Sequence, residues 1–330
     1  MPLPRLNSLR LPWPTNWSEL FGREAPLILE IGFGKGQFLQ YLSRRFPEAN
    51  IIGLEISNRC LVMAENAIER LGMSNVRVIH STAETALHHL FEPATISQIH
   101  INFPDPWFKE RHSKRRLMQR DTLDVMVNRL EPGGLFYLAT DILAYAEMSA
   151  ELLAATPGLD NLLPDRWAHS MPDRVVTKYE AAAAREGRDR YYFAYRRNSL
   201  PAPDVPVIKE LEMPHVVFSG PLTLNEIQAA FTPWESSTGE AVLHFIDCYR
   251  GRDSLLFETY VNEPTLEQRI ALILRVRRGG DFSLMVSPLG HPRATAGVHA
   301  AVAGLMRWLM SLHPDIKLID SKVRNLAPEQ

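Results

Sequence analysis

The stretch LILEIGFGKG, residues 27–36, decides the fold. Its first half is a short apolar run that is typical of a buried strand, and its second half carries Gly32, Gly34 and Gly36. Glycines at such a point let the backbone approach a ligand, and the N-terminus of a following helix supplies unpaired N–H groups. The stretch therefore predicts a strand–turn–helix unit that binds a ligand at its turn, although a turn that serves packing alone has the same pattern.

From this turn onward, short apolar runs alternate with helical patterns. Strands are expected at 27–34, 51–56, 76–80, 99–103 and 135–140, and helices at 37–45, 59–71, 83–91 and 121–130. Strands that alternate with helices indicate a mostly parallel sheet with helices on both faces, an α/β architecture. Ligands of such sheets bind beyond the carboxyl ends of the strands.

The chain of 330 residues is long enough for two domains. Residues 201–207 contain three prolines and are interpreted as a linker between an α/β domain, residues 1–200, and a smaller α+β domain, residues 208–330. The second domain is expected to hold a hairpin, two further strands and a long helix, at 239–264, 269–277, 282–286 and 294–312. From Pro201 to Gln330 there are 12 Lys and Arg against 15 Asp and Glu, which does not indicate a basic RNA-binding module.

The overall composition excludes several classes of protein. The net charge is -2, so any basic footprint must be local. Cys60 and Cys248 form no C-x-x-C pair, which argues against a disulfide scaffold or a thiolate metal site and fits the reducing cytosol. No signal peptide and no membrane span are expected. The histidines show no metal-ligand spacing, and His88 and His89 are interpreted as an exposed pair on a helix.

The residues around the glycine turn indicate an adenosine ligand. The spacing G-x-G-x-G differs from the dinucleotide pattern G-x-G-x-x-G, because Gln37 stands where the third glycine would be. Glu30 suits the cationic amino acid portion of S-adenosylmethionine better than a pyrophosphate. Glu55 closes the next expected strand, where an acidic residue commonly accepts hydrogen bonds from ribose hydroxyls. Glu55 suits S-adenosylmethionine and NAD alike, so a dehydrogenase remains the weaker alternative.

A second stretch, FPDPWFKERHSKRR at residues 103–116, follows the fourth expected strand. Its prolines fix φ and hold Asp105 and Trp107 rigidly at the carboxyl edge of the sheet. A methyltransferase must hold its nucleophile within about 3–3.5 Å of the methyl carbon, which such a turn favours. Five Lys and Arg side chains then stand between residues 109 and 116. This run indicates contact with a phosphate backbone, and its alternative is a solvated helix face.

Together these motifs resemble the bacterial tRNA (guanine-N7-)-methyltransferase family. The resemblance covers residues 1–200 and is carried by EIGFGKG, GLEIS, FPDPWFKERHSKRR, ATD and TKYE, at 30–36, 53–57, 103–116, 139–141 and 177–180. It implies a class I, Rossmann-like methyltransferase fold that uses S-adenosylmethionine. It also implies methylation of the variable-loop guanine, position 46, of tRNA in the cytoplasm, without a metal.

The resemblance also assigns site residues by position. The residue treated as catalytic is Asp105. Those expected to bind the donor are Glu30, Gly32, Gly34, Gly36, Glu55, Thr82, Ala83 and Asp105. Those expected to bind the substrate guanosine are Lys109, Asp141, Thr177, Lys178, Tyr179 and Glu180. Those expected to contact RNA are Arg111, His112, Ser113, Lys114, Arg115 and Arg116. Thr82 departs from the family, which usually has an acidic or amide residue at this position.

Guanine N7 carries a lone pair and no proton, so its attack on the methyl group needs no general base. Asp105 is therefore interpreted as an orienting group that stabilises developing positive charge. Asp141 is expected to accept from the N1–H and N2–H edge of guanine, and its alternative role is a helix cap. Other functions left open are methylation of another RNA guanine, of a protein or of a small molecule, and RNA binding without turnover.

Overall fold

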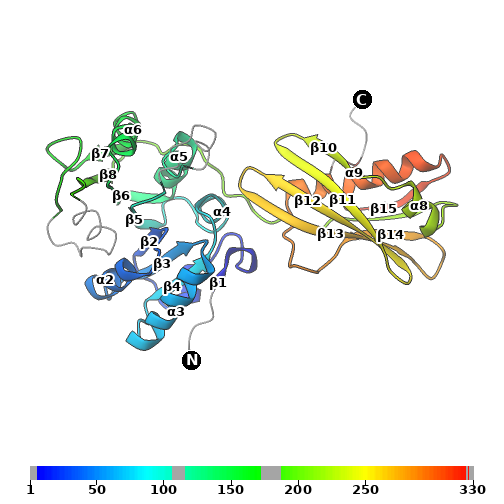
Figure 1. Ribbon diagram of the computed structural model, residues 1–330, viewed down its shortest axis with the longest axis horizontal. Helices are drawn as coiled ribbons and strands as arrows, with labels where there is room; N and C mark the ends of the chain where they lie inside the picture. The colour runs from blue at the N-terminus through cyan, green and yellow to red at the C-terminus, as the bar shows by residue number, and fades with distance from the viewer. Residues whose placement is uncertain (1–5, 106–115, 172–186, 325, 327–330) are drawn as a thin grey trace. The chain divides into compact units, whose positions relative to one another are not determined.

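The structure is a computed structural model that describes residues 6–105, 116–171, 187–324 and 326. The chain divides into two compact units, Met1–Ile208 and Lys209–Gln330, and each unit has its own sheet (Figure 1). None of the helices in these residues is long and apolar enough to cross a lipid bilayer.

Unit 1 is built on one sheet of eight described strands in the order β1-β4-β3-β2-β5-β6-β8-β7. The strands are β1 (Leu6–Asn7), β2 (Leu27–Ile31), β3 (Asn50–Glu55), β4 (Val76–His80), β5 (Ile96–Asn102), β6 (Leu130–Thr140), β7 (Leu159–Asn161) and β8 (Tyr191–Arg197). Neighbours from β1 to β6 are parallel, whereas β8 runs antiparallel to both β6 and β7. The expected mostly parallel sheet is confirmed.

Helices cover both faces of this sheet. They are η1 (Ser8–Arg10), α1 (Trp17–Phe21), α2 (Gln37–Arg45), α3 (Asn58–Leu71), α4 (Ala83–His89), α5 (Arg120–Arg129) and α6 (Leu143–Ala154). One core cluster joins Leu39 of α2 and Leu61 of α3 to Ile28 and Ile51 of the sheet. Helices α4, α5 and α6 lie on the opposite side of the sheet from α2 and α3 (Figure 1).

Local sequence signals account for the ends of several elements. Helix α2 begins after Gly36, which has φ +73°, a value that favours glycine. Helix α3 begins at the cap Ser57, whose hydroxyl accepts from the Cys60 N–H, and ends at the left-handed Gly72. The predicted bounds of α2 and β4 agree with the structure to the residue, and those of α3 to within one residue.

Two expectations within unit 1 were wrong. Strand β6 begins at Leu130 and not at Leu135, because the segment Glu131–Gly134 continues the strand and Leu130 pairs with Ile96 across a register shift. His89 is buried and not exposed, because its ring packs against that of Trp13, tilted by 33° at a centroid distance of 3.9 Å. Both outcomes depend on contacts with distant parts of the chain.

Part of the proline-rich segment packs on unit 1. The guanidinium of Arg129 is fully buried and donates to the carbonyl oxygens of Leu87, Val205 and Pro206, at 2.9, 3.0 and 3.3 Å. The Ile208 N–H donates to the His88 carbonyl oxygen at 3.0 Å. The boundary between the compact units therefore follows Ile208.

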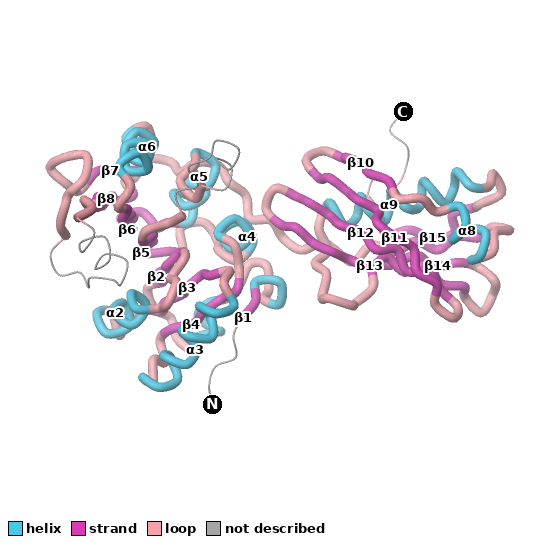
Figure 2. Tube along the Cα trace, viewed as in Figure 1, coloured by secondary structure: helices cyan, strands magenta, loops and turns pink. Residues whose placement is uncertain are grey.

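Unit 2 consists of an antiparallel sheet in the order β10-β11-β12-β13-β14-β9-β15 and of the helices α8 and α9 (Figure 2). The elements are β9 (His215–Ser219), α8 (Leu224–Ala230), β10 (Trp234–Thr238), β11 (Ala241–Arg250), β12 (Ser254–Glu263), β13 (Leu266–Val276), β14 (Phe282–Val286), α9 (Ala296–Leu312) and β15 (Lys317–Ser321). The expected α+β character, the hairpin β11–β12 and the long helix α9 are confirmed.

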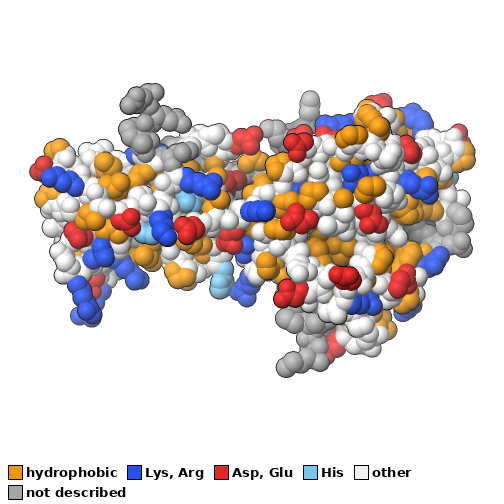
Figure 3. All heavy atoms as spheres, turned by 180° about the vertical axis from the view of Figure 1, so that it is seen from behind, with side chains coloured by type: hydrophobic (Ala, Val, Ile, Leu, Met, Phe, Trp, Pro, Cys, Tyr) orange, Lys and Arg blue, Asp and Glu red, His pale blue; other side chains and the backbone are white. Residues whose placement is uncertain are grey.

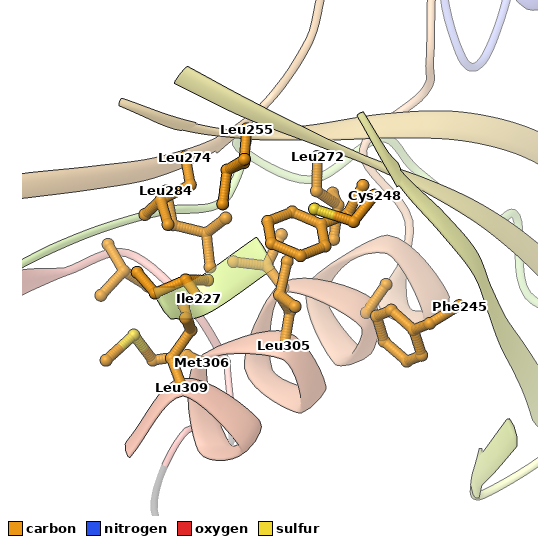
Figure 4. Packing of buried hydrophobic residues seen from close by; sticks show 14 of the residues in the cluster. Ile227, Phe245, Cys248, Leu255, Leu272, Leu274, Leu284, Leu305, Met306 and Leu309 are labelled. Atoms are coloured by element: carbon orange, nitrogen blue, oxygen red, sulfur yellow. The ribbon is translucent and has the colours of Figure 1, made fainter. Parts of the chain in front are cut away.

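The core of unit 2 lies between its sheet and α9. Leu305 and Leu309 of α9 face Leu272 and Leu284 of the sheet, and all four side chains are fully buried (Figure 4). Burial of this many aliphatic side chains, at about 25 cal/mol per Å² of apolar surface, supplies the main stabilisation of the unit. On the face of the molecule shown in Figure 3, basic side chains are interspersed with acidic ones.

Candidate active site

The candidate site lies where the carboxyl ends of four parallel strands meet. Strand β2 has β3 on one side and β5 on the other, and β6 follows β5. In sheets of this kind a ligand binds in the crevice where the strand order reverses, which is between β2 and β5 here. The residues at these strand ends are Glu30, Glu55, Asp105 and Asp141.

The glycine turn between β2 and α2 has the backbone shape that only glycine adopts readily. Gly32, Gly34 and Gly36 have φ values of +73°, +55° and +73°. A Cβ atom at Gly36 would lie 3.2 Å from the Cβ of Ala64 on α3, so this glycine also lets the turn pack closely. The positive φ values and the close approach to Ala64 therefore explain locally why glycines stand in this turn.

Glu55 ties the end of β3 to this turn. Its Oε2 accepts from the Gly34 N–H at 2.9 Å, and its Oε1 accepts from the N–H groups of Ile56 and Ser57 at 2.9 and 3.0 Å. A carboxylate oxygen has two lone pairs, so Oε2 has acceptor capacity for one more hydroxyl group. The carboxylate is held in a fixed orientation by the backbone of both strand ends.

Glu30 is a buried carboxylate at the end of the central strand. Glu30 is only 1% exposed. Asn102, at the end of β5, donates from its Nδ2 to Oε1 of Glu30 at 3.2 Å. Burial of a carboxylate is costly unless charged or hydrogen-bonding partners compensate it. The pair therefore places a buried carboxylate between β2 and β5, near the carboxyl ends of these strands.

Thr82 and Ala83 lie at the start of α4, beside the end of β4. The Thr82 hydroxyl accepts from the Thr85 N–H at 3.1 Å and so caps the helix. The residue is exposed, and Ala83 in the first turn is buried. The cap gives Thr82 a structural role that an acidic or amide side chain would also perform.

The turn that follows β5 has a strained backbone. Phe103 has φ +52°, an uncommon value for a bulky residue, and its N–H donates to the Ala139 carbonyl oxygen at 2.8 Å. Strain of this kind persists where surrounding structure fixes it, and it clusters at functional sites. The turn directs the chain to Asp105, whose side chain is exposed at the carboxyl edge of the sheet.

Asp141 follows β6 and does not cap the next helix. The N-cap of α6 is Ile142, which makes no side-chain capping bond, and the Ile142 N–H donates to the Thr140 hydroxyl at 3.2 Å. The Asp141 carboxylate instead forms an ion pair with the guanidinium of Arg188. The alternative expectation of a capping role is therefore wrong.

Much of the expected RNA-contacting and substrate-binding set lies outside the described residues. This applies to Lys109, Arg111, His112, Ser113, Lys114, Arg115, Thr177, Lys178, Tyr179 and Glu180. Arg116 is described, and its guanidinium contacts the sulfur of Met148 on α6 at 3.7 Å. Arg116 thus lies at the face of unit 1 that carries α6.

Two residues of this site were not found from the sequence. Asn102 directly precedes the FPDPW motif, but its contact with Glu30 depends on the register of β2 against β5. Arg188 has no local signal, because its contact with Asp141 depends on the antiparallel pairing of β8 with β6. Within the residues that the structure describes, no group of three or more His, Cys, Asp or Glu side chains is arranged to hold a metal ion.

Comparisons with known proteins identify the family of this chain. The family model Methyltransf_4, described as "Putative methyltransferase", matches residues 24–193. A tRNA (guanine-N(7)-)-methyltransferase of Thermus thermophilus is 34% identical over 297 residues, which cover 89% of this chain and 92% of that protein. The match therefore extends from unit 1 well into unit 2.

Two further matches are confined to a smaller part of the chain. A tRNA (guanine-N(7)-)-methyltransferase of Cutibacterium acnes is 41% identical over 180 residues, which cover 54% of this chain and 65% of that protein. Among solved structures, the 16S rRNA methyltransferase KamB is 15% identical with a TM-score of 0.43, and the match covers 59% of this chain and all of that one.

Proposed function

Because the chain belongs to the tRNA (guanine-N7-)-methyltransferase family, we propose that it transfers the methyl group of S-adenosylmethionine to N7 of the variable-loop guanine, position 46, of tRNA. The observation that carries this proposal is the meeting of a glycine turn, two acidic strand ends and the strained Asp105 turn at one edge of the sheet. Its place of action is the cytoplasm, where tRNA substrates are available.

The residues at this edge fit the methyl donor. The glycine turn leaves room for a ligand beside the backbone, and Glu55 is oriented to accept from a ribose hydroxyl through Oε2. Glu30 provides negative charge for an α-ammonium group, and the Ala83 N–H lies at the start of α4, where helix N–H groups are available to an adenine ring. S-adenosylmethionine, when bound, supplies an electrophilic methyl group on a sulfonium.

The protein's own contribution to the reaction is position and charge. Guanine N7 has a lone pair and no proton, so no side chain needs to accept a proton during attack. The product ring is cationic, and a fixed carboxylate near it lowers the energy of the transition state. Asp105, at the end of a strained turn tied to β6, fills this role, and Asp141 accepts from the N1–H and N2–H edge of the base.

The basic run at residues 109–116 binds the tRNA outside the target base. Contacts of Lys and Arg side chains with phosphates position a nucleic acid without reading its sequence. Arg116 belongs to this run and lies against α6. A near-neutral chain with one local basic run is suited to binding through that run and not through its whole surface.

The experiment that tests the proposed target is transfer of labelled methyl from S-adenosylmethionine to unmodified tRNA. Two transcripts are compared, one with guanine at position 46 and one with adenine there. We expect transfer to the first and a loss of at least about 100-fold with the second, because adenine presents an amino group where guanine has O6. Equal transfer to both would mean that another RNA guanine is the target.

A failure of transfer to either transcript would support the alternative that the chain binds RNA without turnover. A matched control separates this outcome from loss of the donor site. Binding of S-adenosylmethionine is measured by calorimetry on the same preparation. Donor binding without transfer would then contradict the proposed activity itself.

A further inference from the structure

The pairing of β6 with β8 brings a basic side chain to the base-binding side of the sheet edge. Strand β8 runs antiparallel to β6, so its first residue, Tyr191, pairs with Thr140, the last residue of β6. Arg188 stands three residues before Tyr191, and Asp141 directly follows Thr140. An antiparallel strand begins where its neighbour ends, and this is why two residues 47 positions apart in the chain meet at the active edge.

The contact between them is unlike an ordinary surface ion pair. The side chain of Asp141 is 14% exposed, whereas that of Arg188 is 40% exposed. The carboxylate is thus largely sheltered and the guanidinium faces partly outward. Arginine paired with a sheltered carboxylate forms a charge-assisted hydrogen bond with a defined geometry, which exposed pairs lack.

Side by side, these two groups present a pattern that matches the Watson–Crick edge of guanine. That edge offers one acceptor, O6, followed by two donors, N1–H and N2–H. A carboxylate only accepts hydrogen bonds, and a guanidinium only donates them, through five N–H groups in a fixed fork. Adenine presents a donor at position 6 and an acceptor at N1, so the same pair would oppose it.

We propose that Arg188 is a specificity-determining residue that donates to O6 of the target guanine while Asp141 accepts from N1–H and N2–H. This inference rests on the proposed function and adds a residue to it. The pair would read the base that is turned out of the RNA fold, which is how proteins recognise single-stranded bases in loops. It leaves N7, on the other side of O6, open toward the methyl donor.

The inference is tested by combining changes in the target base with substitutions of Arg188. Three tRNA substrates carry guanosine, 6-thioguanosine or inosine at the target nucleotide. Sulfur at position 6 is a weaker acceptor than oxygen, and N1–H, N2–H and N7 are retained. Inosine retains O6 and N1–H and lacks the N2 amino group. The rate of methyl transfer, as kcat/KM, is measured for each substrate.

For the wild-type enzyme we expect both modified bases to lower kcat/KM. For Arg188→Met we expect a loss of roughly 10- to 100-fold with guanosine. We also expect no further loss with 6-thioguanosine, because the contact to O6 is already missing. The inosine penalty remains in this variant, since Asp141 is intact. Arg188→Lys, which keeps a charged donor, recovers part of the activity.

Controls separate this role from a structural one. Arg196→Met removes an exposed arginine of β8 and is expected to behave as wild type. Donor affinity of Arg188→Met should stay close to that of the wild type, because Glu30 and Glu55 lie at other strands. An equal 6-thioguanosine penalty in Arg188→Met and wild type would overturn the inference alone. A wild-type enzyme that methylates no guanosine substrate would refute the proposed function as well.

Discussion

Phe103 shows how a single residue links the fold to the chemistry. Its backbone has a positive φ that a phenylalanine rarely adopts, and the conformation is held by the bond from its N–H to Ala139. Such strain costs of order 1–3 kcal/mol, which the rest of unit 1 must offset. This conformation turns the chain sharply at the end of β5, so that Asp105 is exposed at the carboxyl edge of the sheet.

The charge of Asp105 is the first residue-scale prediction. Asp105→Asn keeps the shape of the side chain and removes its charge, so the cationic transition state loses stabilisation. We expect kcat to fall by roughly 100-fold. The measurement is single-turnover methyl transfer with saturating donor and tRNA. Asp165→Asn removes an equally exposed carboxylate of unit 1 and serves as the control, with no change in kcat expected. Wild-type turnover in Asp105→Asn would exclude the electrostatic role.

How far the sequence predicts the site differs from residue to residue. Glu30 and Glu55 are identified by their place at strand ends next to glycines, which is a local pattern. Asn102 and Arg188 are not, because their partners are fixed by the register of neighbouring strands. Thr82 was expected to matter for the donor, and its observed bond is a helix cap. The role of a side chain that depends on long-range strand pairing cannot be predicted from local sequence patterns.

At the scale of elements, the same division holds between local and distant causes. Helix α2 is bounded by a glycine turn on one side and a proline on the other, Pro47, so its limits are local. Strand β6 runs from Leu130 through Pro132 and two glycines to Thr140, and it pairs with β5 at Leu130 and again from Leu135 onward. The helix before this segment, expected to end at residue 130, ends at Arg129, whereas the start of the strand depends on the long-range pair of Leu130 with Ile96.

One histidine joins three segments of unit 2. His299 of α9 contacts the Glu212 carbonyl oxygen through Nε2 at 2.8 Å, and its Nδ1 accepts from the Arg324 N–H at 3.2 Å. These bonds require the neutral ring, with its proton on Nε2. Burial lowers the pKa of His299, and the bond to Glu212 opposes this in part. Protonation of Nδ1 would break the bond to Arg324.

This predicts a pH dependence for the stability of unit 2. Because the folded pKa is below the unfolded value of about 6.5, the unfolded chain binds the proton first. The contribution of His299 to the free energy of unfolding is complete above that value and is lost as the pH falls below it. We expect His299→Gln to cost about 1 kcal/mol at pH 7.5 and to flatten the decline in stability below about pH 6.5.

The check is calorimetric unfolding across this pH range. Unit 2 also holds the pairs His215–Asp320 and His244–Glu235, so the comparison is the difference between variant and wild type. His313→Gln, at an exposed histidine near Asp315, is the matched control. If the variant and the wild type decline in parallel below pH 6.5, His299 is not the cause.

At the scale of the molecule, the candidate site belongs to one of the two units. Unit 1 holds every described residue of the candidate site, and the family model ends within it, at residue 193. The match to the relative from Thermus thermophilus extends into unit 2, so part of the sequence of unit 2 has a counterpart in at least one relative. The balance of acidic over basic residues in unit 2 indicates that it does not hold tRNA by charge alone.

Identification of the methylated atom is the most direct test of the proposed N7 methylation. Borohydride and aniline break an RNA chain at 7-methylguanosine and leave unmodified guanosine intact. After reaction with the enzyme and S-adenosylmethionine, end-labelled tRNA is treated in this way and its fragments are sized. We expect one new break, at position 46 in the variable loop. Methyl incorporation without any break would show that the methyl group is not on N7, and would contradict the account.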